Sequence, residues 1–179
     1  SVGEDGRVHF YRHDEEGELL VAARAQALAL SQDEGDYLRL LVRRHMRVHF
    51  IANREQQLNR RIIYRYFRDL GEVGVDVCLH SLADLIATRG PEMPVEVWEK
   101  ELDICRDLMQ AWFEQPEEVV SPPRILTGHD LMAEFNLAPG PRLGELLEAV
   151  REAQASGEVT GRVQALDLVK GLLAQYPQA

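Results

Sequence analysis

Residues 58–87 read LNRRIIYRYFRDLGEVGVDVCLHSLADLIA, and this stretch decides the fold. The apolar residues of its first half are Leu58, Ile62, Ile63, Tyr66 and Phe67. Their spacing of three or four residues predicts an amphipathic helix that stops near Gly71. The strongly apolar run from Val75 to Ala87 predicts a second, central helix. Because both helices must bury apolar faces against other elements, the stretch predicts a helical bundle.

Helical periodicity continues on both sides of this stretch. An acidic first turn, Asp14 to Glu18, precedes an apolar stripe from Leu19 to Leu30, which suits a helix N-terminus. Ser31 to Glu34 has the sequence of a capping box and predicts the start of the next helix. A long amphipathic helix is predicted from Val95 to Phe113. Since only Arg7 to Tyr11 suggests a short strand or an extended lead-in, the predicted fold class is all-α.

A proline-rich break separates this bundle from a smaller helical appendix. Residues 116–123 combine acids, valines and a Pro-Pro pair, which argues against a helix and predicts a linker. Further helices are expected at Gly128 to Phe135, at Arg142 to Ala155 and after Thr160, which can cap the last one. The predicted domains are therefore a main bundle at residues 1–115, a linker at 116–123 and a C-terminal appendix at 124–179.

Charge is distributed very unevenly along the chain. The full sequence carries 20 Lys+Arg against 30 Asp+Glu, but residues 39–68 hold nine arginines, no lysine and a single acid, Glu55. This basic window therefore has a charge of +8, whereas the other residues, with 11 basic and 29 acidic side chains, have −18. The nine arginines are Arg39, Arg43, Arg44, Arg47, Arg54, Arg60, Arg61, Arg65 and Arg68.

So many arginines in one window favour a nucleic-acid interface. A guanidinium group binds phosphate through two parallel hydrogen bonds and stacks on bases. Aromatic residues such as Tyr64 and Phe67 lie among the arginines, and this mixture suits RNA. The predicted RNA-binding residues are Arg43, Arg44, Arg47, Arg60, Arg61, Arg65 and Arg68. The alternative is that several of these arginines form ion pairs with acids of neighbouring helices.

The cysteine and hydropathy patterns indicate a cytoplasmic protein. Cys78 and Cys105 lie inside apolar helical patterns, and two separate cysteines form no disulfide framework, so a reducing compartment is expected. No apolar run approaches the length of a membrane span, and no signal peptide is visible. We therefore expect a cytoplasmic location and no membrane partner.

Three residues could contribute to a metal site, and each has a structural alternative. His13 is followed by Asp14 in a polar segment at a predicted helix start, where both also fit the helix terminus. His45 ends an apolar stripe and can interact with a helix C-terminus. Asp84 lies among apolar residues of a central helix, so a buried carboxylate is expected, with an arginine, a histidine or a metal as partner. His13, His45 and Asp84 would form an incomplete ligand set for a divalent metal.

The sequence contains no recognisable catalytic motif. Residues 71–74 read GEVG, but they lack the Lys-Ser/Thr ending and the preceding strand of a phosphate-binding loop. The two cysteines do not have zinc-site spacing. No catalytic residue is therefore predicted in this chain.

The ordered motifs resemble the helical region of bacterial tRNA nucleotidyltransferases and poly(A) polymerases that carry an HD-like domain. The first block is RRIIYRYFRDLG at residues 60–71, followed by SLAD at 81–84. The second block comprises LTGHDLM at 126–132, PGPRLGELL at 139–147 and EAQASGEV at 152–159. Together with FYRH at 10–13 and VRRHMR at 42–47, the resemblance covers nearly the whole chain.

The resemblance implies a part of an enzyme. The family's β-containing head domain, which holds two metal-binding carboxylates, has no counterpart in this sequence and is expected upstream of Ser1. The first His-Asp doublet of a full HD-like domain is also missing. His13 falls at the later Gly-His position of the pattern, and His45 and Asp84 fall at the downstream His and Asp positions. Residues 1–115 would then be a partial HD-like domain with an incomplete metal shell.

The function that the resemblance implies is RNA binding for nucleotide addition to RNA 3′ ends. The basic window would bind the phosphate backbone, and the C-terminal appendix at residues 124–179 would extend the contact along the RNA. The partners would be a tRNA or another structured RNA 3′ end, and the head domain of the same polypeptide. The parent enzyme would use Mg²⁺, whereas this chain alone is expected to be inactive and to hold no tightly bound cofactor. Two alternatives stay open: an HD-type metal-dependent phosphohydrolase domain with His13, His45 and Asp84 as ligands, and a scaffold or dimerisation module that uses the helix from Trp98 to Trp112.

Overall fold

The computed structural model describes residues 12–54 and 57–175, and in these ranges the chain is all-α, as predicted. The segment Arg7–Tyr11, for which a strand or lead-in was expected, lies outside the described residues. The chain divides into two compact units that are interleaved in sequence. Unit 1 comprises the residues up to 56 and residues 70–108, and unit 2 comprises residues 57–69 and 109–179. The domain bounds drawn from the sequence stay a prediction.

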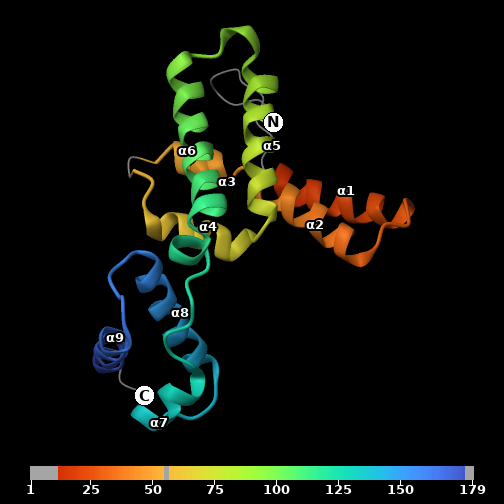
Figure 1. Ribbon diagram of the computed structural model, residues 1–179. Helices are drawn as coiled ribbons and strands as arrows, with labels where there is room; N and C mark the ends of the chain where they lie inside the picture. The colour runs from red at the N-terminus through yellow and green to blue at the C-terminus, as the bar shows by residue number, and fades with distance from the viewer. Residues whose placement is uncertain (1–11, 55–56, 176–179) are drawn as a thin grey trace. The chain divides into compact units, whose positions relative to one another are not determined.

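Unit 1 begins with a helical hairpin. α1 (His13–Ala27) and α2 (Gln32–Arg44) lie side by side and are joined by a short turn (Figure 1). Ser31 caps α2 as predicted, because its side chain accepts a hydrogen bond from the backbone N–H of Glu34 and the Glu34 carboxylate accepts one from the backbone N–H of Ser31. Gly17 allows the two helices to approach closely, since a Cβ at this position would lie 2.9 Å from Cγ1 of Val42.

The core of unit 1 is formed by α3 (Arg47–Ala52), α5 (Val73–Arg89) and α6 (Val95–Glu114). α5 and α6 lie side by side and are joined through the short 3-10 helix η1 (Gly90–Glu92) (Figure 1). Fully buried side chains include Val48, Val77, Cys78, Cys105 and Leu108. The two cysteines form no disulfide, and Sγ of Cys105 donates a hydrogen bond to the backbone carbonyl of Cys78 at 3.5 Å. The apolar run at residues 75–87 therefore lies on a central helix, as predicted.

Local sequence fixes both ends of α4 (Arg60–Leu70). At the start, Oδ1 of Asn59 accepts a hydrogen bond from the backbone N–H of Ile62 at 3.0 Å, which satisfies one of the donors that a helix N-terminus leaves open. At the end, Gly71 adopts a φ of +54°, in the left-handed region that glycine enters without a steric penalty. The predicted stop near Gly71 is thereby confirmed.

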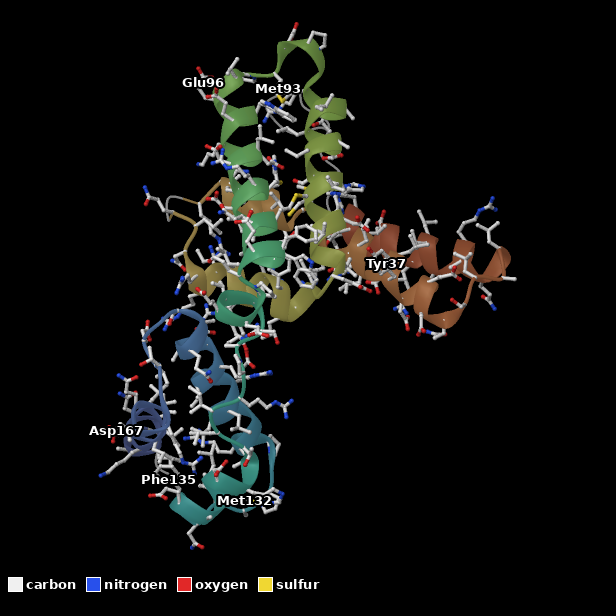
Figure 2. The ribbon with its side chains drawn as sticks, in the orientation of Figure 1. Tyr37, Met93, Glu96, Met132, Phe135 and Asp167 are labelled. Carbon is white, nitrogen blue, oxygen red and sulfur yellow. The ribbon has the colours of Figure 1, made fainter. Side chains whose placement is uncertain are left out.

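The core of unit 2 is enclosed by α7 (Gly128–Phe135), α8 (Pro141–Ala155) and α9 (Arg162–Gln175). Its buried residues are Leu126, Leu131, Leu146, Val150, Ala153, Val159, Ala165 and Val169. Phe135, labelled in Figure 2, packs against this cluster. All three helices lie close to the positions predicted from the sequence.

The segment at residues 116–123 contains a helical turn, so the prediction that it excludes helix was wrong. Pro116–Val120 forms a five-residue π-helical turn, η2. Proline is tolerated at the first position of such a turn because no backbone N–H is needed there. Val119 and Val120 are buried, and η2 packs against α8. The two valines therefore anchor this segment to unit 2.

Candidate nucleic-acid interface

The C-terminal arginines of the basic window lie on α4 in unit 2. Arg61, Arg65 and Arg68 are four and three residues apart, so their side chains share one helical face. Carboxylates of α8 lie opposite this face. Arg65 donates two hydrogen bonds of 2.6 and 2.8 Å to Glu152, and Arg68 donates one of 3.1 Å to Glu148.

Arg60 and Arg61 of α4 have carboxylate partners as well. Arg61 contacts Glu152 at 3.1 Å and Glu158 at 2.9 Å, and Arg60 contacts Glu118 at 3.3 Å. We call these contacts, with those of Arg65 and Arg68, the α4 ion-pair ladder. Its arginine side chains remain 38–52% exposed, and exposed ion pairs of this kind stabilise a fold by only about 0–1 kcal/mol each.

Tyr64 joins α4 to the same carboxylates. Its hydroxyl donates a hydrogen bond to Oε1 of Glu148 at 3.1 Å, although the rest of the side chain is buried. Burial, and then the negative charge of Glu148, raise the pKa of Tyr64 to about 12. The hydrogen bond to Glu152 likewise raises the pKa of Arg65. The phenol stays protonated and the guanidinium stays charged at any physiological pH.

The N-terminal half of the basic window lies in unit 1 and also has acidic partners. Arg43 of α2 contacts Asp14 at 2.8 Å and Glu15 at 3.1 Å, both on α1. Arg44 is exposed, and in the described part of the chain it makes no ion pair. Arg47 is half-buried in the first turn of α3.

These contacts show that many arginines of the basic window are paired with acids from other parts of the sequence. Five of the seven arginines predicted to bind RNA have carboxylate partners, so the alternative weighed for the window, internal ion pairing, occurs in the structure. The strong segregation of charge along the sequence therefore does not produce an equally strong segregation in space. Binding of RNA by the seven arginines stays a prediction.

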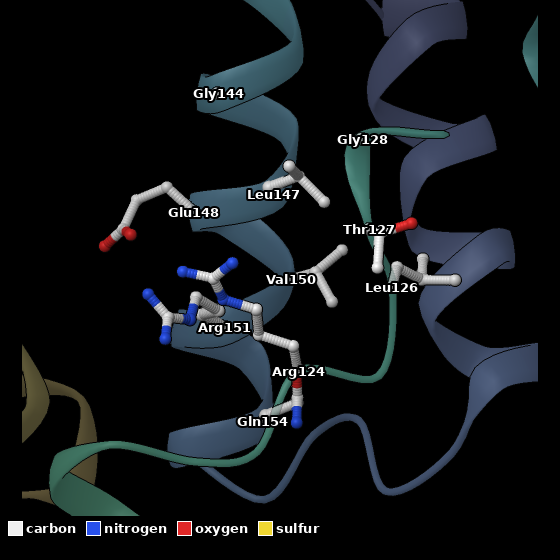
Figure 3. Close-up of a pocket in the computed structure, with 10 residues that line it drawn as sticks. All are labelled: Arg124, Leu126, Thr127, Gly128, Gly144, Leu147, Glu148, Val150, Arg151 and Gln154. Atoms are coloured by element: carbon white, nitrogen blue, oxygen red, sulfur yellow. The ribbon is translucent and has the colours of Figure 1, made fainter. Parts of the chain in front are cut away.

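A pocket that the sequence analysis did not find lies beside α8 in unit 2 (Figure 3). It has a volume of about 230 Å³ and lies between α8 and the chain that leads into α7. The residues that line it are Arg124, Leu126, Thr127, Gly128, Gly144, Leu147, Glu148, Val150, Arg151 and Gln154. Its two arginines lie far from the basic window in sequence, which is why the charge pattern gave no signal for it.

The pocket arginines differ from those of α4 in their partners. Neither the Arg124 nor the Arg151 side chain forms an ion pair or hydrogen bond within the described residues, and the Nε atom of Arg151 is buried. Their guanidinium groups point to the same side of the pocket (Figure 3). Nε2 of Gln154 donates to the carbonyl of Pro123 at 2.8 Å, whereas its Oε1 is buried without a partner.

The residues predicted for a metal site come together only in part. His13 and His45 face each other with their Nε2 atoms 2.9 Å apart. His45 is buried, and its Nδ1 donates to the carbonyl of Val42 at 2.6 Å, which leaves its Nε2 facing His13. The ring of His80 lies 5.4 Å from that of His45. Among the described residues, no group of three or more His, Cys, Asp or Glu is placed to hold a metal. Metal binding by His13, His45 and Asp84 stays a prediction.

Among the described residues of unit 1, the buried carboxylate is that of Glu101 and not that of Asp84. Asp84 is only half-buried, contrary to expectation, whereas the side chain of Glu101 on α6 is 1% exposed. Ser81 of α5 donates a hydrogen bond to Oε1 of Glu101, and Nδ1 of His49 on α3 lies 3.0 Å from Oε2. The hydrogen bond to Glu101 raises the pKa of His49. We call these three residues the Glu101 network.

Glu101 could have been found from the sequence. Val97, Cys105 and Leu108 are separated from it by four, four and seven residues, so Glu101 lies on the apolar stripe of its helix. A carboxylate on such a stripe is buried when the helix packs and must be hydrogen-bonded. Asp84 has apolar neighbours in sequence but does not lie on the buried face of α5.

A family model and two curated proteins that match this chain are all tRNA nucleotidyltransferases. The tRNA nucleotidyltransferase domain 2 family matches residues 118–169. The A-adding tRNA nucleotidyltransferase of Deinococcus radiodurans is 34% identical over 172 residues, which are 96% of this chain and 37% of that protein. The CC-adding tRNA nucleotidyltransferase of Thermus thermophilus is 30% identical over 162 residues, which are 90% of this chain and 33% of that protein. No solved structure matches the chain.

The chain thus spans about a third of the length of these curated relatives. Within the described residues, no helix combines the length and apolar character needed to cross a membrane. The comparisons do not bear on the HD-like assignment of residues 1–115, which stays a prediction. The motifs at residues 60–71 and 126–159 and the two relatives lead to the same conclusion: this chain belongs to the tRNA nucleotidyltransferase family.

Proposed function

We propose that this chain is the helical, RNA-holding part of a tRNA nucleotidyltransferase. The observation that supports the proposal is the alignment of 96% of the chain with an A-adding enzyme and of 90% with a CC-adding enzyme. Both relatives are named for adding nucleotides to tRNA. The RNA partner of this chain is then a tRNA or another structured RNA 3′ end.

In this proposal the chemistry belongs to a head domain on the remaining part of the polypeptide. The RNA 3′-hydroxyl attacks the α-phosphate of a nucleoside triphosphate and pyrophosphate leaves, with Mg²⁺ held by head-domain carboxylates. No residue of this chain is catalytic. Its contribution is to bind the RNA and to position its 3′ end, which lowers the entropic part of the barrier.

In this proposal the arginines predicted from the sequence bind RNA phosphates, but those with carboxylate partners must first give up or share these partners. The arginines of the α4 ion-pair ladder share their charge with carboxylates, so an RNA phosphate must replace or share these partners. The exchange costs little, because an exposed ion pair contributes only about 0–1 kcal/mol. The release of counterions from RNA favours it and makes it dependent on salt.

Binding of tRNA by the purified chain tests the proposal. Labelled tRNA is titrated with the chain at several salt concentrations, with duplex DNA of similar length as the control. We expect tRNA to bind more tightly than the duplex, and log K to fall with log salt by about 0.7–0.9 for each phosphate contact. Failure to bind tRNA at low salt would contradict the proposal.

A second assay tests the division between holding and catalysis. The chain is incubated with tRNA, Mg²⁺ and labelled ATP or CTP, and the products are separated by length. We expect no extension of the tRNA, because the chain has neither a phosphate-binding loop nor a paired-carboxylate motif. Extension by a preparation free of other enzymes would show that the transfer site lies in this chain.

A further inference from the structure

The pocket beside α8 is lined by two arginines and one acid, Glu148. Arg124 and Arg151 make no ion pair in the described part of the chain, and their guanidinium groups point to the same side (Figure 3). Each guanidinium is a planar fork that donates two parallel N–H groups to an oxyanion. A phosphate group has several oxygens in a tetrahedral arrangement, so two neighbouring guanidinium groups can bind it together.

Two buried polar atoms of the pocket residues also lack partners. The Nε of Arg151 is an unsatisfied donor, and the Oε1 of Gln154 is an unsatisfied acceptor. The contact of Gln154 Nε2 with the carbonyl of Pro123, at 2.8 Å, fixes which end of the amide accepts. Leaving such atoms unpaired costs free energy. Both atoms are closed to solvent, so a ligand with an oxyanion and a hydroxyl donor pairs with them only when the two side chains turn toward the pocket.

The other residues that line the pocket leave space for a phosphate group and add no unbalanced negative charge. Glu148 is the single acid among the lining residues, and it accepts hydrogen bonds from Tyr64 and Arg68, both at 3.1 Å, so Arg68 balances its charge. Gly128 and Gly144 line the pocket without side chains. A Cβ placed on Gly144 would meet no atom within 4 Å, which shows that this wall is open.

We propose that this pocket binds one ribose–phosphate unit of an RNA backbone. Arg124 and Arg151 hold the phosphate, and Oε1 of Gln154 accepts a hydrogen bond from the ribose 2′-hydroxyl. The 2′-hydroxyl is the group by which a protein distinguishes RNA from DNA. The inference rests on the proposed function and deepens it, because it assigns RNA selectivity to a site outside the basic window.

Two matched double variants test the assignment of the phosphate. One is Arg124→Gln with Arg151→Gln, and the other is Lys100→Gln with Arg106→Gln on exposed positions of α6 in unit 1. Both remove two positive charges, but only the first removes them from the pocket. We expect the pocket variant to bind tRNA roughly tenfold more weakly than the control variant, because two charge-assisted contacts are lost. Its salt slope should be flatter by about 0.7–0.9, the value for one phosphate.

The outcomes separate this inference from the proposed function. If the unaltered chain fails to bind tRNA, both are overturned. If it binds tRNA but the two double variants have the same affinity and salt slope, the pocket assignment is overturned and the proposed function stands.

A steric variant tests the same site with both arginines in place. Gly144→Leu fills the open wall, and Gly144→Ala is its control, since both residues favour a helix over glycine and α8 should be retained. We expect the leucine variant to lose affinity for tRNA severalfold and the alanine variant to keep it, with circular dichroism melts confirming that both are folded. Equal affinity of the folded variants would overturn the inference.

Two further measurements identify the source of the phosphate. Gln154→Ala should reduce the preference for a single-stranded RNA over DNA of the same sequence, and an unchanged preference would overturn the role of Gln154. Thermal melts with inorganic phosphate, at constant ionic strength, test a free anion. If phosphate raises the melting temperature of the unaltered chain but not of the pocket variant, while both bind tRNA equally, the site serves free phosphate and the RNA assignment is overturned.

Discussion

Glu152 of unit 2 and Glu101 of unit 1 are both helical carboxylates with two partners, but they differ in burial. Glu152 is 15% exposed and is shared by Arg61 and Arg65, whose side chains are about half exposed. Glu101 is 1% exposed and is held by Ser81 and His49. The first arrangement can exchange a partner for a ligand at little cost, whereas loss of a partner from the second leaves a buried carboxylate without compensation.

The comparison shows that the number of arginines on a surface does not measure its capacity to bind an anion. The α4 ion-pair ladder has four arginines, each with a carboxylate partner. The pocket beside α8 has two arginines without one among the described residues. We therefore expect stability to depend most on the Glu101 network and tRNA affinity to depend most, per arginine, on the pocket.

Replacing Glu101 should have the largest effect on stability. Glu101→Ala leaves His49 and Ser81 without their buried partner, so the free energy of unfolding should fall by about 3–5 kcal/mol. Urea unfolding followed by circular dichroism measures this change. Glu99→Ala, on the exposed side of α6, is the control and should stay within about 0.5 kcal/mol. A loss below about 1 kcal/mol for Glu101→Ala would remove the distinction between the two carboxylates.

The pH dependence of unfolding should show the contribution of His49. Its hydrogen bond to Glu101 raises its pKa above the ordinary value of 6.5, so protonated His49 stabilises the folded state. This stabilisation is complete below about pH 6.5 and is lost as the pH rises through the folded-state pKa. Urea midpoints of the unaltered chain should therefore fall between pH 6 and pH 8 more than those of His49→Gln, which keeps a hydrogen-bond donor but does not titrate. Parallel profiles would show that His49 is not protonated in the folded state.

Replacing Glu152 should have a smaller effect on stability and an opposite effect on binding. Glu152→Gln weakens exposed ion pairs, so the free energy of unfolding should fall by no more than about 1 kcal/mol. Affinity for tRNA should rise, because Arg61 and Arg65 are freed for phosphate. Glu145→Gln removes the same charge from an exposed position of α8 and is the control. If both variants gain affinity equally, the ladder does not compete with RNA.

Removing metal ions should have the smallest effect. His13 and His45 are the only two of the three predicted ligands that the described structure brings together, so we expect no tightly held metal. The melting temperature should be the same with and without EDTA, since only an ion bound to the folded state adds to stability. A clear fall with EDTA, together with stoichiometric metal by elemental analysis, would instead favour a metal-dependent phosphohydrolase domain.

The helices could be predicted because their signals are local. The spacing of apolar residues located α4 and α5, and Ser31 and Gly71 marked a start and a stop within one turn of the chain. The same reasoning failed at η2, because two buried valines outweighed the low helix propensity of a segment that begins with Pro116.

The candidate site was less predictable because its partners are distant in sequence. Arg65 and Glu152 are 87 residues apart, and Arg61 and Glu158 are 97 apart. Periodicity identifies the face on which an arginine lies but not the helix opposite that face. The pocket beside α8 joins residues of the segment before α7 to residues of α8, so it exists only once unit 2 has folded.

The two cysteines of the chain provide a reporter for the opening of one unit. Cys78 and Cys105 both lie in the core of unit 1, and unit 2 contains no cysteine. The contact with Cys78, and then burial, raise the pKa of the Cys105 thiol, whereas alkylating reagents react with the thiolate. Each labelling event therefore requires unit 1 to open first. The rate of labelling, measured with and without tRNA, gives the opening free energy of this unit separately from that of its neighbour.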